Sequence, residues 1–459
     1  MIRIQYASEV EKEFFAPRSF SGSAETVRAV IEDVKKRGDA ALRDYAKKFD
    51  AASPASFLLP EDELRSAAEK LKRERVALYD ALSYSYDAAL RFAKKQKESF
   101  SDFEVELEPG VFTGQKTIPV ESAGAYIPAG RFPLISTVIM TTSPALAAGV
   151  KNLVICTPPR VHPNDMREAE RSGTGQAGKP FVGGAPYADE GIMAAAFICG
   201  VKTVFACGGA QAVAAMAFGT ESIPAVDVIV GPGNKFVAAA KKEVYGTVGI
   251  DMLAGPTEVF IIADSSADPA WLAADLLAQA EHDPVAQPVL ATPDGKLAER
   301  VAAEIEAQLA SLPTRATAEE SISSCGRIII TGSLEEAAEL ANRKAPEHLE
   351  LAVSEGSECD KLVSLVHNYG SLFIGHYAAE VFGDYAAGLN HTLPTSGSAR
   401  FTGGLSVRHF LKTATTLRTA ENKAELPKGV KDSFKAAFEL GKAEGLYAHA
   451  RAADVRLQS

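Results

Sequence analysis

The sequence predicts an α/β fold with two successive units of parallel sheet. Short, continuous apolar segments rich in Val, Ile and Ala alternate with helical segments in two series. Strands of this kind are typical of parallel sheets that helices cover on both faces. Strands are expected in the first series at 124–127, 153–156, 203–206 and 226–230, and in the second at 258–263, about 287–291, 327–330, about 349–353 and 371–374.

The bulk composition narrows the function classes. The chain has 459 residues and a net charge of −11, from 48 Lys plus Arg and 59 Asp plus Glu. An acidic chain argues against nonspecific nucleic-acid binding, which needs a basic face. Five scattered cysteines without a CxxC pair favour reduced thiols in a cytoplasm. The N-terminus has no apolar signal core and no run is long enough to span a bilayer, so no membrane partner is expected.

The remaining segments are mostly helical by periodicity. Residues 1–22 are expected as an extended or short helical arm, followed by helices that begin near Ser23 and Asp39. A long charged helix is expected from 60 to about 101, then two strands near 103–107 and 111–119. Residues 160–186 interrupt the first series with Gly, Pro and charges and are interpreted as a long surface loop. The tail from about 406 is expected to be helical, over 407–417 and 428–448.

Glycine-rich turns follow three strands of the first series. They are Gly124–Gly130, Gly208–Ala212 and Gly231–Lys235. Turns at the carboxyl ends of parallel strands are where such sheets bind nucleotides and phosphates. One such turn is as often only a tight connection, but three on one sheet edge favour a ligand site.

Gln279 and His282 lie three residues apart at the end of an expected helix, 268–278, which Pro284 stops. They share one helix face, so an amide oxygen and an imidazole lie side by side. Such groups could form half of the first shell of Zn²⁺. Taken alone, the pair is more simply a polar helix end that faces water.

Two further segments bring carboxylates and imidazoles together. Glu347 and His348 are adjacent in an extended segment, so they should point to opposite sides and not touch, although both could flank one substrate. Histidine suits general-base work and glutamate can activate water. Asp384, in the polar loop 383–397, is a candidate carboxylate ligand. Glu444 and His449 lie near the end of the chain, where a lone histidine is usually solvated.

Taken together, these segments resemble the histidinol dehydrogenase family along nearly the whole chain, from 37–42 to 449–452. The matching motifs are the glycine turns with Tyr126, Gln211 and Asn234, and the segments 254–258, 279–282, 345–349, 383–385 and 444–449.

The resemblance implies an oxidoreductase that converts L-histidinol to L-histidine through L-histidinal, with NAD and one zinc ion per subunit, in the last steps of histidine biosynthesis. It implies His348 as the base and Glu347 as the group that activates water. None of the five cysteines lies in the motifs, which argues against a thioester route. By resemblance NAD contacts Tyr126, Gln211 and Asn234; zinc is held by Gln279, His282, Asp384 and His449; and substrate contacts Thr257, Gln279, His282, His348, Asp384, Glu444 and His449.

The resemblance also implies an architecture. We expect two Rossmann-like parallel-sheet domains lacking GxGxxG, and a homodimer with shared active sites. The N-terminal arm and the helical C-terminal tail are expected to pack across that dimer. The expected division is an arm at 1–22, a zinc and substrate domain at 23–123 and 255–405, an NAD domain at 124–254, and a dimerisation tail at 406–459.

Some residues depart from the family pattern and leave the substrate open. Thr257 stands where the family usually has serine, the 160–186 segment looks inserted, and Arg131 could contact a sulfonate, an NAD phosphate or only water. The family has relatives that oxidise other hydroxy compounds, including sulfonated diols, so this is the alternative function. A non-catalytic two-lobed binding protein is a third, but it does not explain the Glu347–His348 pair.

Overall fold

The computed structural model describes residues 1–16, 23–130, 132–172, 180–420 and 425–458. It divides into two compact units. The first comprises Met1–Lys95 and Val120–Phe410, and the second Gln96–Pro119 and Leu411–Ser459. Arg131, and residues 173–179 of the expected 160–186 loop, lie outside the described residues. No helix in the described part of the chain is both long and apolar enough to cross a membrane.

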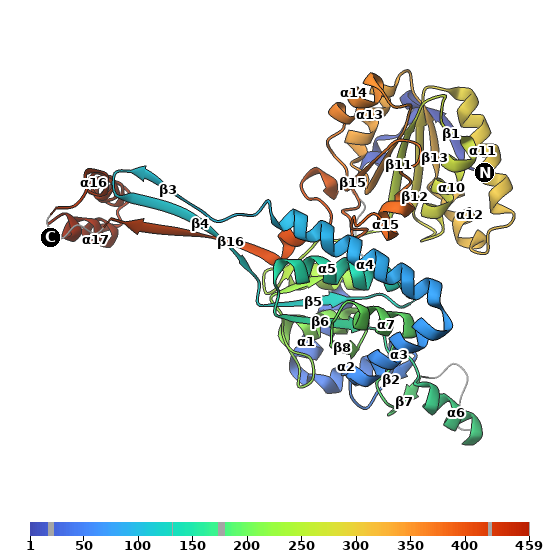
Figure 1. Ribbon diagram of the computed structural model, residues 1–459, viewed down its shortest axis with the longest axis horizontal. Coiled ribbons are helices and arrows are strands. Elements are labelled where there is room, and N and C mark those ends of the chain that lie inside the picture. Colours follow the sequence, from blue (N-terminus) through green and yellow to red (C-terminus); the bar gives the residue numbers. More distant parts are fainter. Residues whose placement is uncertain (17–22, 131, 173–179, 421–424, 459) are drawn as a thin grey trace. The chain divides into compact units, whose positions relative to one another are not determined.

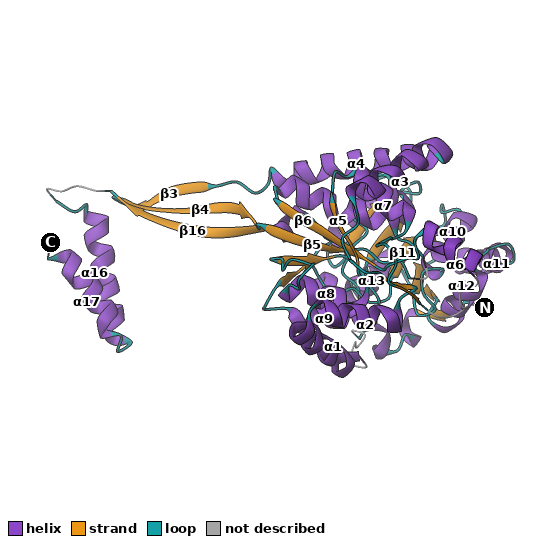
Figure 2. Ribbon diagram, turned by 90° about the horizontal axis from the view of Figure 1, so that it is seen from below, coloured by secondary structure: helices purple, strands orange, loops and turns teal. Residues whose placement is uncertain are grey.

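The first unit contains a five-stranded sheet in which all strands run parallel. Helices α1, α8 and α9 lie on one face and α5 and α7 on the other (Figure 1 and Figure 2). The chain enters at the central strand and extends the sheet first to one side and then to the other, so the turns after the two neighbouring strands β5 and β9 face a crevice. The order is β10 (Gly249–Ile250), β9 (Val228–Val230), β5 (Ser122–Tyr126), β6 (Asn152–Thr157) and β8 (Thr203–Ala206), and the helices are α1 (Ala24–Arg37), α5 (Ile135–Ala148), α7 (Glu190–Ile198), α8 (Gly209–Phe218) and α9 (Lys235–Val244).

A six-stranded parallel sheet, also in the first unit, repeats this strand order around β11 and adds one edge strand. All six residues of β11 are buried, as its unbroken apolar run predicts. Helices α10, α11 and α12 cover one face and α13 and α14 the other. The order is β1 (Arg3–Tyr6), β13 (Arg327–Ile330), β12 (Gln287–Thr292), β11 (Glu258–Ala263), β14 (His348–Ala352) and β15 (Ser371–Ile374), with α10 (Pro269–Ala280), α11 (Gly295–Leu309), α12 (Arg315–Ser324), α13 (Leu334–Lys344) and α14 (Ser357–Leu365). The expected α/β class with parallel sheets is confirmed.

The second unit is a three-stranded antiparallel sheet with a pair of packed helices (Figure 2). Strands β3 (Phe103–Glu108) and β4 (Val111–Pro119) lie where the sequence predicted strands. The third strand, β16 (Leu411–Thr419), shows that the expected helix at 407–417 was wrong. Its threonines favour an extended backbone, and it pairs residue by residue along all of β4. The helices are α16 (Lys428–Ala443) and α17 (Tyr447–Leu457).

The N-terminal arm, expected as extended or short helical, contains a strand, because Arg3–Tyr6 pair with β13 and extend the six-stranded sheet. Two other local expectations need correction. The long helix at 60–101 is two helices, α3 (Glu61–Glu74) and α4 (Val76–Lys97), separated where Arg75 leaves helical geometry at φ −138° and ψ 57°. The 160–186 segment is not all loop, since it contains α6 (Pro163–Ser172) and β7 (Phe181–Val182), which pairs with β2 (Ala52–Ser53).

The division of the chain also differs from the expected one. Helices α1 and α2 (Asp39–Phe49) were expected with residues 255–405, but Val27 and Leu42 share a buried cluster with Met216 and Ile229 of the five-stranded sheet. The expected absence of GxGxxG was wrong as well, because residues 173–178 read Gly-Thr-Gly-Gln-Ala-Gly. This string lies outside the described residues and follows the helix α6 rather than a strand, so it lacks the context of a dinucleotide turn.

Candidate active site

The catalytic candidates meet at the amino ends of two neighbouring strands, β11 and β14. Thr257 immediately precedes β11, and Glu347 immediately precedes β14, which His348 begins. The two strands pair in parallel, so their amino ends lie at the same sheet edge. Helix α10 runs back after β11, and its carboxyl end therefore returns Gln279 to this edge. Chain direction alone brings together residues that are far apart in sequence.

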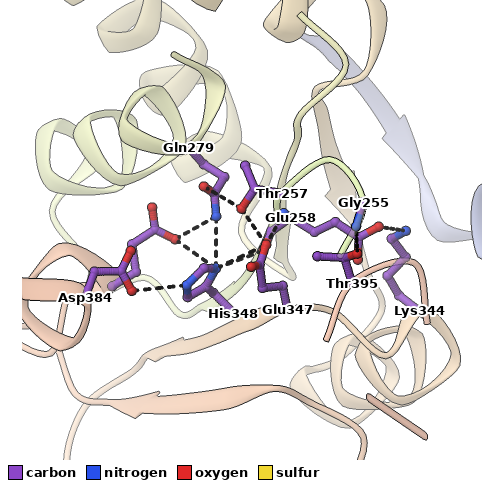
Figure 3. Close-up of polar contacts among 10 residues, drawn as sticks. Gly255, Thr257, Glu258, Gln279, Lys344, Glu347, His348, Asp384 and Thr395 are labelled. Atoms are coloured by element: carbon purple, nitrogen blue, oxygen red, sulfur yellow. Dashed lines mark hydrogen bonds and ion pairs between the residues drawn. The ribbon is translucent and has the colours of Figure 1, made fainter. Parts of the chain in front are cut away.

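Glu347 is held by two donors at the start of β11. Its Oε2 accepts from the backbone N of Glu258 at 2.9 Å and from the hydroxyl of Thr257. The same hydroxyl lies 3.1 Å from Oε1 of Gln279 (Figure 3). Gln279 is only 1% exposed, so the interpretation of this helix end as a water-facing surface was wrong.

His348 is the centre of the cluster. Its Nδ1 lies 3.0 Å from Nε2 of Gln279 and 3.2 Å from the carbonyl oxygen of Glu258, and its Nε2 lies 3.3 Å from Oδ1 of Asp384. Nδ1 is also 3.8 Å from the Glu347 carboxylate, so the expectation that these neighbours do not touch was wrong. Glu347 lies before the strand, and its side chain turns back to the Glu258 amide instead of alternating across the sheet.

The surroundings shift the protonation of both groups. Burial raises the pKa of Glu347 to about 7. Burial opposes the charge on His348, but the carboxylates of Asp384, Glu347 and Glu380 outweigh it and raise the pKa of His348 well above its ordinary value. Burial likewise opposes the charge on Asp384, but the neighbouring imidazolium holds the pKa of that carboxyl below its usual range. The carboxylates around His348 therefore favour its protonated form.

A second layer of buried acids lies behind the cluster, and sequence reasoning missed it. Glu380 accepts from Nε2 of Gln279 at 3.1 Å, and its backbone N donates to Oε1 of Glu350 at 2.7 Å. Burial, then the charge of Asp275, raises the pKa of Glu350 to about 8. Glu350 had a signal in the sequence, since it is a lone charge in an apolar strand, whereas Glu380 had none.

A basic group, also missed, braces the start of β11. Nζ of Lys344 donates to Oε1 of Glu258 at 2.9 Å and to Oε1 of Gln287 at 2.6 Å, and all three residues are buried. The backbone amide of Glu258 is the one that holds Glu347. Lys344 therefore stabilises the strand end that positions the Glu347 carboxylate.

A cavity of about 760 Å³ lies at the carboxyl ends of the five-stranded sheet. The three predicted cofactor residues, Tyr126, Gln211 and Asn234, all line it. The hydroxyl of Tyr126 accepts from the backbone N of Gly209 at 3.1 Å, and Nε2 of Gln211 lies 3.5 Å from Oδ2 of Asp50. Asn234 caps α9 with its own side chain. The cavity is large enough for a small-molecule cofactor.

His282 lies between this cavity and the polar cluster around His348. Its side chain is solvent-accessible and lines the cavity, although it comes from the end of α10. The surrounding protein lowers the pKa of His282 by desolvation, and the charge of Asp384 opposes this. His391 was not predicted. Its Nε2 lies 3.1 Å from Oγ of Ser136 at the start of α5. The His391 side chain also interacts electrostatically with Asp384.

Two predicted residues are not in this cluster. Glu444 and His449 belong to the second unit, where both side chains are exposed. Among the residues that the structure describes, no group of three or more His, Cys, Asp and Glu side chains is arranged to hold a metal ion. Gln279, His282 and Asp384 supply an amide, an imidazole and a carboxylate to one neighbourhood in the first unit.

Comparison with known proteins decides the family. A family model described as histidinol dehydrogenase matches residues 17–457. The chain belongs to the histidinol dehydrogenase family. It is thus an NAD-dependent oxidoreductase, and the resemblance drawn from the motifs is confirmed.

Individual relatives support the assignment over the full length. The chain is 39% identical to a histidinol dehydrogenase of Dechloromonas aromatica, with all of both chains covered. It is 41% identical to a sulfopropanediol 3-dehydrogenase of Ruegeria pomeroyi, over 94% of this chain and 92% of that protein. The crystal structure of histidinol dehydrogenase from Elizabethkingia anophelis is similar with a TM-score of 0.86 and 34% identity, covering 99% of this chain and 97% of that one.

Proposed function

We propose that this enzyme oxidises L-histidinol to L-histidine through L-histidinal, with two molecules of NAD. The observation that carries the proposal is the position of α10. Its last residues include Gln279, which contacts His348, and directly after it His282 lines the cavity with Tyr126 and Asn234. The base and the cofactor cavity are therefore adjacent, as hydride transfer requires.

The two acid–base groups divide the work. In the alcohol step, His348 takes the hydroxyl proton while hydride leaves for the nicotinamide, so that alcohol and NAD give aldehyde and NADH. In the aldehyde step, Glu347 removes a proton from a water that adds to the carbonyl. The resulting hydrate donates the second hydride and becomes the acid. Because the pKa of Glu347 is raised to about 7, its carboxylate is a stronger base than an ordinary glutamate and can accept this proton near neutrality.

The residues of the cluster fit a zinc ion. Gln279, His282 and Asp384 offer oxygen and imidazole donors that suit Zn²⁺, and His449 would be the fourth. Asp384, Glu347 and Glu380 crowd around one imidazole, and burial raises the pKa of both glutamates, so their ionised forms are costly here and a dication would stabilise them. When bound, zinc would supply a Lewis acid that helps to orient the substrate. If Asp384 held the ion, its charge would favour the protonated form of His348 less, and His348 could then serve more readily as the base.

We further propose a homodimer in which the second unit of each chain serves the site of the other. Phe103, Val105 and Leu107 alternate along β3 and are 55%, 45% and 62% exposed, so the strand presents an apolar row. An apolar surface of this kind on a small antiparallel sheet favours cover by another protein surface. Glu444 and His449 are exposed on the same unit and are accessible to a partner.

Complementation between two inactive variants tests the shared site. His282→Ala and His449→Ala are co-expressed, and mixed dimers are purified with two different affinity tags. With shared sites, both lesions fall in one site of a mixed dimer and the other site is intact, so up to about half of normal activity returns. If mixed dimers form and stay inactive, each site lies within a single chain.

The substrate is tested by rate and by product. L-Histidinol should support NADH formation, and chromatography should identify histidine as the product. The 41% identity to a sulfopropanediol 3-dehydrogenase makes a sulfonated diol the second candidate. A kcat/KM for the sulfonated diol above that for L-histidinol would overturn the proposed substrate and leave the reaction class intact.

A further inference from the structure

The usual anion site of such sheets is partly occupied in this cavity. A dinucleotide carries two negative charges on its pyrophosphate, and parallel α/β sheets usually bind it with free amides at a helix N-terminus. Here several of these amides are already engaged. The backbone N of Gly209, at the start of α8, donates to the hydroxyl of Tyr126 at 3.1 Å. Those of Phe236 and Val237 in α9 donate to Oδ1 of Asn234 at 2.9 and 3.2 Å. The remaining amides of α8 carry only partial charges, so a cationic side chain would add to the neutralisation of the pyrophosphate.

One cationic side chain is in the right place. Among the described residues that line the cavity, Arg160 is the only permanent cation. It follows β6, which lies between β5 and β8 in the sheet, so it is at the same carboxyl edge as the glycine turns. Its backbone N donates to the carbonyl of Tyr187 at 2.8 Å, and Pro158 and Pro159 restrict the backbone before it. The side chain is half-buried and starts from a rigid segment.

The guanidinium is oriented but not neutralised. Its Nη2 donates to the carbonyl oxygen of Ala129 at 2.6 Å, which leaves its other N–H groups for further acceptors. In the described part of the chain, Arg160 forms no ion pair with a carboxylate. Asp50, which also lines the cavity, interacts electrostatically with Arg160. Burial raises the pKa of Asp50 to about 7, and the charge of Arg160 opposes the rise. A half-buried arginine without a carboxylate partner is suited to an anionic ligand.

We propose that Arg160 binds the pyrophosphate of NAD and so supplements the helix N-terminus as the anion site of this cavity. The assignment rests on the cavity being the cofactor site, as in the proposed function. The free N–H groups of the guanidinium match two phosphate oxygens in a fork, while the bond to Ala129 fixes its plane. Tyr126, Gln211 and Asn234 are uncharged at neutral pH and contribute contacts without neutralising the phosphates.

The test uses the full-length enzyme and probes that need no substrate. ADP-ribose carries the pyrophosphate and adenosine does not, and their binding is measured by competition with NAD and by calorimetry. Arg160→Gln should weaken ADP-ribose binding and raise KM for NAD by about 10- to 100-fold, the range of a charge-assisted hydrogen bond. Adenosine binding and kcat should stay within about twofold. Arg160→Lys keeps the charge without the fork and should give an intermediate loss.

An exposed arginine outside the cavity provides the matched control. Arg167→Gln removes an exposed arginine of α6 that does not line the cavity, and it should change neither probe. Equal losses for ADP-ribose and adenosine would show that Arg160 only shapes the cavity, and unchanged ADP-ribose binding would show that it does not contact the phosphates. Either result overturns the assignment. A shift confined to NADP, with NAD unchanged, would also overturn it. Failure of L-histidinol as a substrate would leave the ADP-ribose result standing, so the two proposals fail separately.

Discussion

A buried ion pair clamps the turn that carries Asn234, and breaking it should weaken both the fold and cofactor binding. Lys241 and Asp251 pair directly with side chains that are 2% and 0% exposed. Nζ of Lys241 donates to the carbonyl of Gly231 at 2.9 Å, and the backbone N of Gly231 donates to Oδ2 of Asp251 at 2.8 Å. Both polar atoms of Gly231 are thus held, three residues before Asn234.

The structure sets the expected size of the effect. Removing one partner of a buried pair costs about 3–5 kcal/mol, because the other charge stays buried. In Lys241→Met, Asp251 still accepts from the backbone N of Gly231 and of Met252, the latter at 2.6 Å. These donors favour the charged carboxylate, so we expect the lower end, about 3 kcal/mol. That corresponds to a fall in Tm of about 4 °C for a unit as large as the first one, Met1–Lys95 with Val120–Phe410. Because the turn loosens, KM for NAD should rise about tenfold.

The assay combines thermal unfolding by calorimetry with steady-state kinetics. Lys242→Met is the matched control, because this lysine is the next residue of α9 and is exposed. Lys241→Met/Asp251→Asn removes the unpaired charge. It should be more stable than Lys241→Met by about 1–2 kcal/mol, yet keep the raised KM, since the carbonyl of Gly231 still lacks its donor. If Lys241→Met unfolds at the same temperature as Lys242→Met and binds NAD as well, the clamp is refuted.

Three other predictions concern the catalytic cluster. Glu347→Gln should slow aldehyde oxidation more than alcohol oxidation, and His348→Asn should slow both, each by about 10²–10⁴-fold. Stopped-flow traces of NADH, started from the alcohol or from the aldehyde, separate the two steps. Equal slowing of both steps by Glu347→Gln would refute the division of roles. Dialysis against a chelator should abolish turnover while circular dichroism stays largely unchanged, and full activity in verified metal-free enzyme would contradict a zinc requirement. The pKa of Glu350 is raised from 4.5 to about 8, so the stability that its protonated form provides is lost as pH rises through about 8. The side chain of Glu350→Gln cannot ionise, so the Tm of the variant minus the Tm of the native protein should increase from about pH 5 to 8. A difference in Tm that does not change with pH would contradict a buried, protonated Glu350.

Local pattern was enough for much of the fold. The run Glu258–Ala263 is unbroken and apolar apart from its first residue, and a strand buried on both faces is the arrangement that accommodates it. In α1, Val27, Val30, Ile31 and Val34 recur at helical spacing, and all four are buried. Pattern failed at Leu411–Thr419, where apolar spacing suggested a helix. That segment is a strand because β4 supplies a pairing partner almost 300 residues earlier, and no local window contains that information.

The candidate active site shows the same division between what the sequence determines and what the tertiary structure determines. Residue types and motif order by themselves determined that the chain is a parallel α/β oxidoreductase. They also pointed to Glu347, His348 and Gln279, because the functional groups of these side chains can be recognised from the residue type alone. Only the tertiary structure decided that these three side chains form one cluster around His348 and that Glu380 contacts Gln279 in it. It also decided that the pKa of Glu347 is raised to about 7. The physical reason is that desolvation and charge–charge interaction depend on distance in space, which the parallel pairing of β11 and β14 and the return of α10 bring about.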